Sequence, residues 1–162
     1  LKERLDAINT RNPERPPLLV KLAPDLDDSS YEPILEAAIE GGAQGLILTN
    51  TTIARPATLR DPAARESGGL SGRPLAPRSR DVLRIVSGLN KGRLALISCG
   101  GIETGEDILA RIRMGADMVQ IYSSFVLQGP GILTRMKTEL LEAMRRDGFE
   151  SIADAHGVDR PD

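Results

Sequence analysis

The segment LALISCGGIETGEDILARI, from Leu94 to Ile112, changes from an apolar run to a glycine pair and then to a helix start. Leu94–Ser98 is apolar enough for a strand in a sheet that helices cover. Thr104 has the position of a helix N-cap, because Asp107 follows three residues later as in a capping box. Apolar residues then recur at helical spacing, at Ile108, Leu109 and Ile112. The segment therefore predicts a strand joined by a turn to a helix, the repeating unit of parallel α/β folds.

Three other segments repeat this order of strand and helix. Apolar runs predict strands at Leu18–Leu22, Gly45–Thr49 and Met118–Tyr122, and a helical pattern of apolar residues follows each of them. Strands joined through helices pair in parallel with right-handed crossovers. The pattern fits half of a (β/α)8 barrel or a small open α/β sheet, and composition alone does not choose between them.

The ends of the predicted helices are marked by capping residues. The first helix follows Ser29 or Ser30 and has Pro33 in its first turn. Another carries Val82, Leu83 and Val86. The last one stops at Gly148 and carries one row of apolar residues: Ile132, Leu133, Met136, Leu140 and Met144.

The chain opens on Leu1 rather than Met, and Leu1, Leu5 and Ile8 resemble the end of a helix, so we expect a fragment.

Composition narrows the classes of function. The 162 residues are 40% hydrophobic, and 21 basic and 23 acidic residues give a net charge of −2, as in an ordinary single domain. There is no basic block, and the two Tyr, two Phe and no Trp offer few aromatic surfaces for bases, which argues against nucleic acid. The apolar runs are strand-sized, which argues against a membrane span. One Cys and one His give no set of metal ligands.

Polar residues and glycines follow the predicted strands directly. They are Lys21, Thr49–Asn50, Cys99–Gly100–Gly101 and Tyr122–Ser123. The carboxyl ends of parallel strands are where ligands bind, both in barrels and in open sheets. The run Thr49 to Thr52 contains more hydrogen-bonding side chains than a turn requires, so it indicates a ligand.

Individual residues at this edge allow several interpretations. Lys21 could extend its amine to solvent, place a charge beside an electron-rich cofactor, or act as a Schiff-base nucleophile. Gly100 and Gly101 could form only a tight turn, but the hydroxyls that follow the next strand favour a phosphate site. Cys99 is interpreted as a packing residue, because the single His156 lies in the tail and no activating partner is evident.

The connection from Asn50 to Arg78 is longer than usual, so it is either disordered or a functional lid. Its segment ESGGLSGRPL, from Glu66 to Leu75, favours a lid because the glycines allow close approach to a flat ligand. The arginines of this stretch would suit an acidic substrate, although a solvated loop surface fits most of them equally well: Arg55, Arg60, Arg65, Arg73 and Arg78.

Five motifs in one order resemble the dihydroorotate dehydrogenase family. They are LVKLAPDL, LTNTT followed by RP, GGLSGRPL, GGI.TGEDI and VQIYSSF, and the resemblance covers Leu18 to Val158. GGLSGRPL resembles the membrane-associated, quinone-dependent class 2 rather than the soluble class 1. The resemblance implies a (β/α)8 TIM barrel that holds FMN, with residues 1–162 supplying about the later four βα units of that single domain.

The resemblance also implies roles for individual residues. Lys21 would lie near the flavin ring and stabilise negative charge on its reduced form, while Thr49 would contact FMN. Asn50 and Thr51 would hydrogen-bond the ring and carboxylate of dihydroorotate. Further FMN contacts would come from Ser71 and Gly72 along the flavin and from a phosphate cradle: Gly100, Gly101, Tyr122 and Ser123. The pair Ser98–Cys99 departs from the Gly-Val expected before the two glycines, which affects flavin packing rather than the phosphate site.

The family reaction would remove the C5 proton of dihydroorotate, transfer hydride from C6 to the flavin and pass electrons to a quinone. The serine base, other substrate-binding asparagines and the helices that meet membrane and quinone would all precede this chain. We therefore expect no catalytic base here and no turnover by the chain alone. We expect pairing with the missing half of the barrel or with a second copy.

The expected location is the cytoplasmic face of a bacterial inner membrane, or the mitochondrial inner membrane, as a peripheral protein. Two alternatives stay open. One is a different phosphate-binding barrel, such as an aldolase that uses Lys21, and the other is a non-catalytic half-barrel that binds partners through its open edges.

Overall fold

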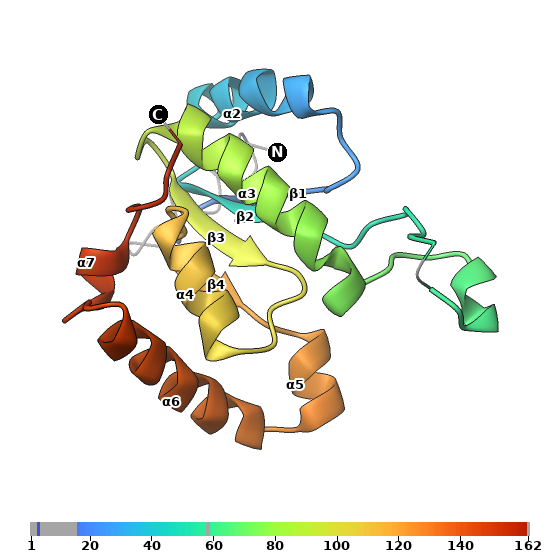
Figure 1. The fold of residues 1–162 in the computed structure, drawn as a ribbon. Coiled ribbons are helices and arrows are strands. Elements are labelled where there is room, and N and C mark those ends of the chain that lie inside the picture. Colours follow the sequence, from blue (N-terminus) through green and yellow to red (C-terminus); the bar gives the residue numbers. More distant parts are fainter. Residues whose placement is uncertain (1–2, 4–15, 58, 162) are drawn as a thin grey trace.

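The computed structural model describes residue 3 and residues 16–57 and 59–161, and a parallel four-stranded sheet lies at its centre (Figure 1). The strands are β1 (Leu19–Leu22), β2 (Gly45–Leu48), β3 (Ala95–Cys99) and β4 (Met118–Gln120), in the spatial order β1-β2-β3-β4. All four predicted strands and their parallel pairing are confirmed, although β4 ends two residues before the predicted end at Tyr122. The predicted helix end around Leu1, Leu5 and Ile8 lies outside the described residues.

Four long helices join or follow these strands: α2 (Tyr31–Glu40), α3 (Ala76–Asn90), α4 (Gly105–Arg113) and α6 (Gly131–Arg146). Figure 1 shows α2, α3 and α4 on the same face of the sheet, with α6 packed outside α4. This one-sided cover is expected of a barrel segment, whereas an open doubly wound sheet has helices on both faces.

Burial along the strands follows this arrangement. Leu46, Leu48 and Leu96 point to the helices and are at most 1% exposed. On the opposite face, Lys21 is exposed and Met118 remains 61% exposed. The main core therefore lies between the sheet and helices α2 and α3, where it includes Tyr31, Leu35, Val82, Leu83 and Val86. Smaller clusters hold α4 and α6 together, around Leu109, Ile112, Ala143 and Met144.

Two short helices were not predicted from the sequence. Helix α5 (Ser123–Gln128) begins directly after β4, so Tyr122 is its N-cap rather than a strand residue. Helix α7 (Ile152–Ala155) lies in the tail and begins with a capping box between Ser151 and Asp154. The S-x-x-D spacing of Ser151 and Asp154 could have predicted the start of α7 from the sequence. Helix α5 has no side-chain cap hydrogen bond that would mark its start.

The long connection folds back on itself in its described part. Thr52 and Leu70 form an antiparallel bridge, with N–H···O distances of 3.1 and 2.7 Å. The Arg55 guanidinium donates to the carbonyls of Ala64, Glu66 and Gly68. Two 3-10 turns, η2 (Pro62–Arg65) and η3 (Arg73–Leu75), follow the same path, after an earlier turn η1 (Asp28–Ser30). The connection is therefore held by the Thr52–Leu70 bridge and by the Arg55 side chain, and its function as a lid stays a prediction.

Arg78 does not belong to a solvated loop surface. It lies in α3 and donates to the carbonyls of Pro24 and Leu26 and to the Asp28 carboxylate. These bonds tie the start of α3 to the segment after β1. Among the described residues, none of the helices has the length and apolar character needed to cross a membrane.

The capping box predicted at the start of α4 is confirmed. Thr104 Oγ1 accepts the Asp107 N–H at 3.1 Å, and the Asp107 carboxylate accepts the N–H groups of Glu103 and Thr104. Arg80 on α3 donates to the same carboxylate at 2.7 Å. Burial raises the pKa of Asp107, but these donors and the positive charge outweigh burial and leave the pKa below its usual value.

We expect Asp107→Asn to lower the free energy of unfolding by about 1 kcal/mol at pH 7, because a carboxylate at a helix N-terminus is replaced by a neutral amide. A lowered folded-state pKa stabilises the fold above the unfolded value of about 3.9 and loses that effect as the pH falls through the folded pKa. Denaturation from pH 7 to pH 2 should therefore show the gap between the two proteins closing in acid. Asp81→Asn, at an exposed site on α3, is the control, and a gap that stays constant with pH would contradict the assignment.

Candidate functional site

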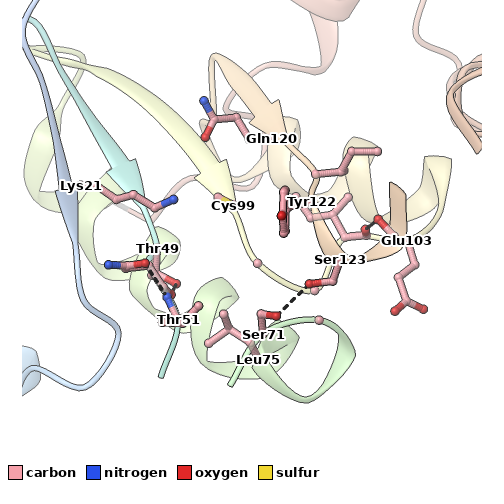
Figure 2. Close-up of a pocket in the computed structure, with 17 residues that line it drawn as sticks. Lys21, Thr49, Thr51, Ser71, Leu75, Cys99, Glu103, Gln120, Tyr122 and Ser123 are labelled. Carbon is pink, nitrogen blue, oxygen red and sulfur yellow. Dashed lines mark hydrogen bonds between the residues drawn. The ribbon is translucent and has the colours of Figure 1, made fainter. Parts of the chain in front are cut away.

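The ten residues to which the family resemblance assigns a ligand contact all line one pocket at the carboxyl edge of the sheet (Figure 2), whereas Thr52 of the same polar run does not. They come from all four strand ends and from the long connection: Lys21, Thr49, Asn50, Thr51, Ser71, Gly72, Gly100, Gly101, Tyr122 and Ser123. The strand register explains this convergence. Leu22 pairs with Leu48 and Leu48 with Ser98, so the residues that follow each strand emerge at the same edge.

The side of the pocket near β1 and β2 combines a cation with amide and hydroxyl groups. Figure 2 shows the Lys21 side chain extending from β1 across the pocket. Thr49 is buried, and its hydroxyl donates to the Asn50 carbonyl at 2.9 Å. The Asn50 side-chain oxygen accepts the Thr51 N–H at 2.9 Å, which leaves its NH₂ group directed elsewhere. Asn50 and Thr51 are both exposed at the pocket, so they can contact a ligand.

The long connection contributes Ser71, Gly72 and Leu75 to the pocket, and its path is held against the residues that follow β2. A Cβ atom at Gly69 would stand 2.0 Å from the Thr51 hydroxyl, so only glycine allows Thr51 to occupy this place. Thr52 is anchored by a short hydrogen bond to Asp25, which also accepts the Ile53 N–H. These contacts fix where the connection leaves the sheet.

The connection also meets the end of β4. The hydroxyls of Ser71 and Ser123 lie 2.9 Å apart, and Figure 2 shows this contact across the pocket floor. A Cβ atom at Gly72 would come within 3.5 Å of Ser123. The residues predicted to line a flavin and those predicted to hold its phosphate are therefore neighbours in space.

The glycine pair after β3 forms a concave turn. Gly100 and Gly101 have φ angles of 114° and 70°, which side chains rarely adopt. A Cβ atom at Gly101 would stand 2.5–2.6 Å from the backbone and Cβ of Ala76. Among the described residues, no acceptor is found for the N–H groups of Gly100 and Gly101. Two free amide donors in a concave turn beside the pocket are suited to an anion such as phosphate.

Seven further residues line the pocket, and the sequence analysis assigned a ligand contact to none of them. They are Leu75, Cys99, Ile102, Glu103, Gln120, Ile121 and Ser124. Gln120 could have been found, because it lies two residues after Met118 and so shares the open face of β4. Ser124 is buried and donates to the Ile102 carbonyl at 2.9 Å, which indicates a structural role. Glu103 pairs with Arg73 at 3.4 Å at the rim.

Alternative site chemistries find no support in the described residues. No group of three potential metal ligands is found among them. His156 lies in the tail, where its Nε2 is 3.3 Å from Asp117, and it does not line the pocket. Cys99 lines the pocket and is partly exposed, and its role as a packing residue stays a prediction.

Comparison with known proteins identifies related chains. A family model described as dihydroorotate dehydrogenase matches residues 2–144. The chain is 53% identical over 148 residues to the dihydroorotate dehydrogenase (quinone) of Rhodospirillum rubrum, covering 91% of this chain and 40% of that protein. It is 42% identical to the mitochondrial dihydroorotate dehydrogenase (quinone) of Mus musculus, over 98% of this chain and 40% of the relative.

A solved structure shares the fold. The structure of DHODH from Eimeria tenella in complex with ferulenol matches with a TM-score of 0.86 and 46% identity, covering 91% of this chain and 39% of that one. The expectation of a partial (β/α)8 barrel is confirmed by this match. The resemblance to the quinone class is confirmed by the relatives from Rhodospirillum rubrum and Mus musculus. The chain spans about 40% of the length of the relatives it matches.

We expect Gly101→Ala to abolish measurable FMN binding, because the new methyl group would push the turn away from Ala76 and rotate its N–H groups. Gly129→Ala is the matched control, since Gly129 has a similar φ of 73° but no atom within 4 Å of the added Cβ. Flavin fluorescence titration measures both. Equal loss of affinity in the two variants would show that backbone strain, and not the cradle, is responsible.

Proposed function

Because the chain belongs to the dihydroorotate dehydrogenase family, we propose that it supplies the FMN-binding part of an enzyme that oxidises dihydroorotate to orotate with a quinone as electron acceptor. One observation carries the proposal. The ten residues to which the family motifs point are spread over 103 positions of sequence, from Lys21 to Ser123, yet they line a single pocket.

The pocket fits the parts of FMN. A phosphate would be held by the free amides of Gly100 and Gly101 together with Tyr122 and Ser123. The ring system would lie against Gly72, Ser71 and Thr49, where the absence of a Gly72 side chain leaves a flat surface. When bound, FMN supplies an acceptor for the hydride that leaves the substrate.

The residues of this chain would then have separate tasks. The Lys21 amine would place a positive charge at the ring, where negative charge develops during reduction. Asn50 and Thr51 would bind the polar groups of dihydroorotate and set its orientation. Figure 2 shows Thr51 on the same side of the pocket as Lys21, so the substrate and the positive charge would lie together there.

A base for the C5 proton would come from outside the chain. Glu103 is the only carboxylate that lines the pocket in the described residues, and it pairs with Arg73 on the side of the phosphate cradle. The rest of the barrel would therefore contribute the base. We also place the contacts with quinone and with a membrane surface in the part of the family's length that this chain does not span.

The alternative of a Schiff-base aldolase is disfavoured by the family match, which assigns the same motifs to an oxidoreductase. A separate non-catalytic role is not favoured by any contact in the pocket.

We expect the 162-residue chain alone to give no dihydroorotate-dependent dye reduction. Turnover should arise when the chain is joined or co-expressed with the preceding part of the Rhodospirillum rubrum relative, which would complete the barrel. In that complex, Asn50→Ala should raise the dihydroorotate Kd by an amount worth about 1–3 kcal/mol, since substrate groups lose a partner, while FMN stays bound. Turnover by the chain alone, or a completed barrel that binds FMN without oxidising dihydroorotate, would refute the proposal.

In the same complex, Lys21→Met should slow reduction of the flavin by about a hundredfold, because the stem is kept but the charge that offsets the reduced ring is lost. Stopped-flow absorbance in the absence of an acceptor measures this step alone. Lys137→Met on α6, whose residue 137 is exposed and remote from the pocket, controls for the change in net charge. An unchanged rate in Lys21→Met would remove Lys21 from the reaction.

A further inference from the structure

Directly behind the glycine turn lies a completely buried arginine. Arg111 on α4 has 0% exposure and is the largest of the fully buried side chains in the described residues. Charged residues are rarely buried to this extent without an ionic partner. Neither the motifs nor the predicted site included this residue.

The hydrogen bonds of the Arg111 guanidinium all go to neutral oxygens. It donates to Ser79 Oγ at 2.8 Å, to the Gly100 carbonyl at 3.1 Å, and to Ser98 Oγ and the Ala76 carbonyl at 3.3 Å each. Its Nε has no acceptor in the described structure. These bonds satisfy most of its donors but neutralise none of its charge.

The carboxylate that could have paired with it is engaged elsewhere. Asp107, one turn earlier on α4, accepts from Arg80 and from the N–H groups of Glu103 and Thr104. Burial lowers the pKa of Arg111 to about 10, and the positive charge of Arg80 adds to that effect. Arg111 therefore stays protonated near neutral pH, as a buried cation that no carboxylate bonds directly, although the charges of Asp107 and Asp81 act on it from a distance.

The bond to the Gly100 carbonyl has a geometric consequence. Ser79 Oγ donates to the same carbonyl at 2.8 Å, so two donors fix the direction of this C=O toward the interior. In a trans peptide unit, the N–H of the next residue points opposite to the C=O. The Gly101 N–H is therefore directed away from Arg111, toward the open side of the turn that lines the pocket.

We propose that Arg111 is a positioning residue that makes this site select the phosphorylated flavin over the unphosphorylated one. It orients the Gly101 amide toward the phosphate and supplies, from behind the turn, the positive charge that a dianion attracts. The role depends on the proposed function only in taking FMN as the ligand. It assigns selectivity to a residue that does not touch that ligand.

The test compares the affinities of FMN and riboflavin, which differ only by the phosphate. NMR titration of the chain, followed at the Gly101 amide, measures weak binding without requiring a complete barrel or turnover. Wild type should prefer FMN. Arg111→Met, which keeps a long apolar stem, should lower the FMN-to-riboflavin affinity ratio by about tenfold or more, because one charge-assisted interaction is lost.

Two variants separate charge from orientation. Arg111→Lys keeps the charge and should restore most of the ratio, whereas Ser79→Ala removes the second donor to the Gly100 carbonyl and should cause a smaller loss. Arg84→Met, at an exposed site on α3, controls for net charge and should leave the ratio unchanged.

Failure of this inference can be distinguished from failure of the proposed function. If Arg111→Met weakens the binding of FMN and of riboflavin equally, Arg111 is merely structural and the inference fails. The proposed oxidation of dihydroorotate by the completed barrel would still stand. If wild type shows no preference for FMN at millimolar ligand, the inference also fails. A retained preference in Arg111→Met at wild-type strength overturns it directly.

Discussion

The shape of the site follows from the burial of one cation, Arg111, that is bonded only by neutral oxygens. Arg111 reaches from α4 to Ser98 on β3, to the start of α3 and to the carbonyl of the glycine turn, so three elements meet at its guanidinium. Burying such a group costs several kcal/mol unless its hydrogen bonds are made. A shift of β3, α3 or α4 would break at least one of them. The turn between β3 and α4 is therefore held from behind, and its amides remain free on the other side.

The sheet is asymmetric, and this asymmetry connects the fold to the site. Helices cover the face that carries Leu46, Leu48 and Leu96, while the face with Lys21 and Met118 is left open (Figure 1). In a closed (β/α)8 barrel the open face becomes the interior, and the edge with the pocket becomes its mouth. The proposed phosphate cradle would lie almost entirely within this chain, because the residues that follow the adjacent strands β3 and β4 line the same pocket. In the proposed function, the base that acts on the substrate carbon would come from the rest of the barrel.

Local signals in the sequence were reliable where a few neighbouring residues decide the outcome. The Thr104–Asp107 capping box was predicted from its spacing and is present, with the expected hydrogen bonds in both directions. Tyr122 was predicted as a strand residue but caps α5, because apolar residues of a six-residue helix carry too little periodicity to be distinguished from a strand end. Arg111 was missed for a different reason. An arginine in a helix is expected at the surface, and nothing nearby in sequence shows that Ser79, Ala76 and Ser98 will surround it.

The four strand-helix units, their parallel pairing and the ten residues at one edge could be predicted from the sequence, because strand periodicity, caps and motif order are local properties. Which face of the sheet the helices cover and where the long connection attaches became evident only in the folded chain. The folded chain also showed that a buried cation stands behind the glycine turn. These features depend on contacts between residues far apart in the chain, such as Ser71 with Ser123 and Arg111 with Ser79. Such contacts exist only once parallel strands have brought their carboxyl ends together, and no local pattern encodes them.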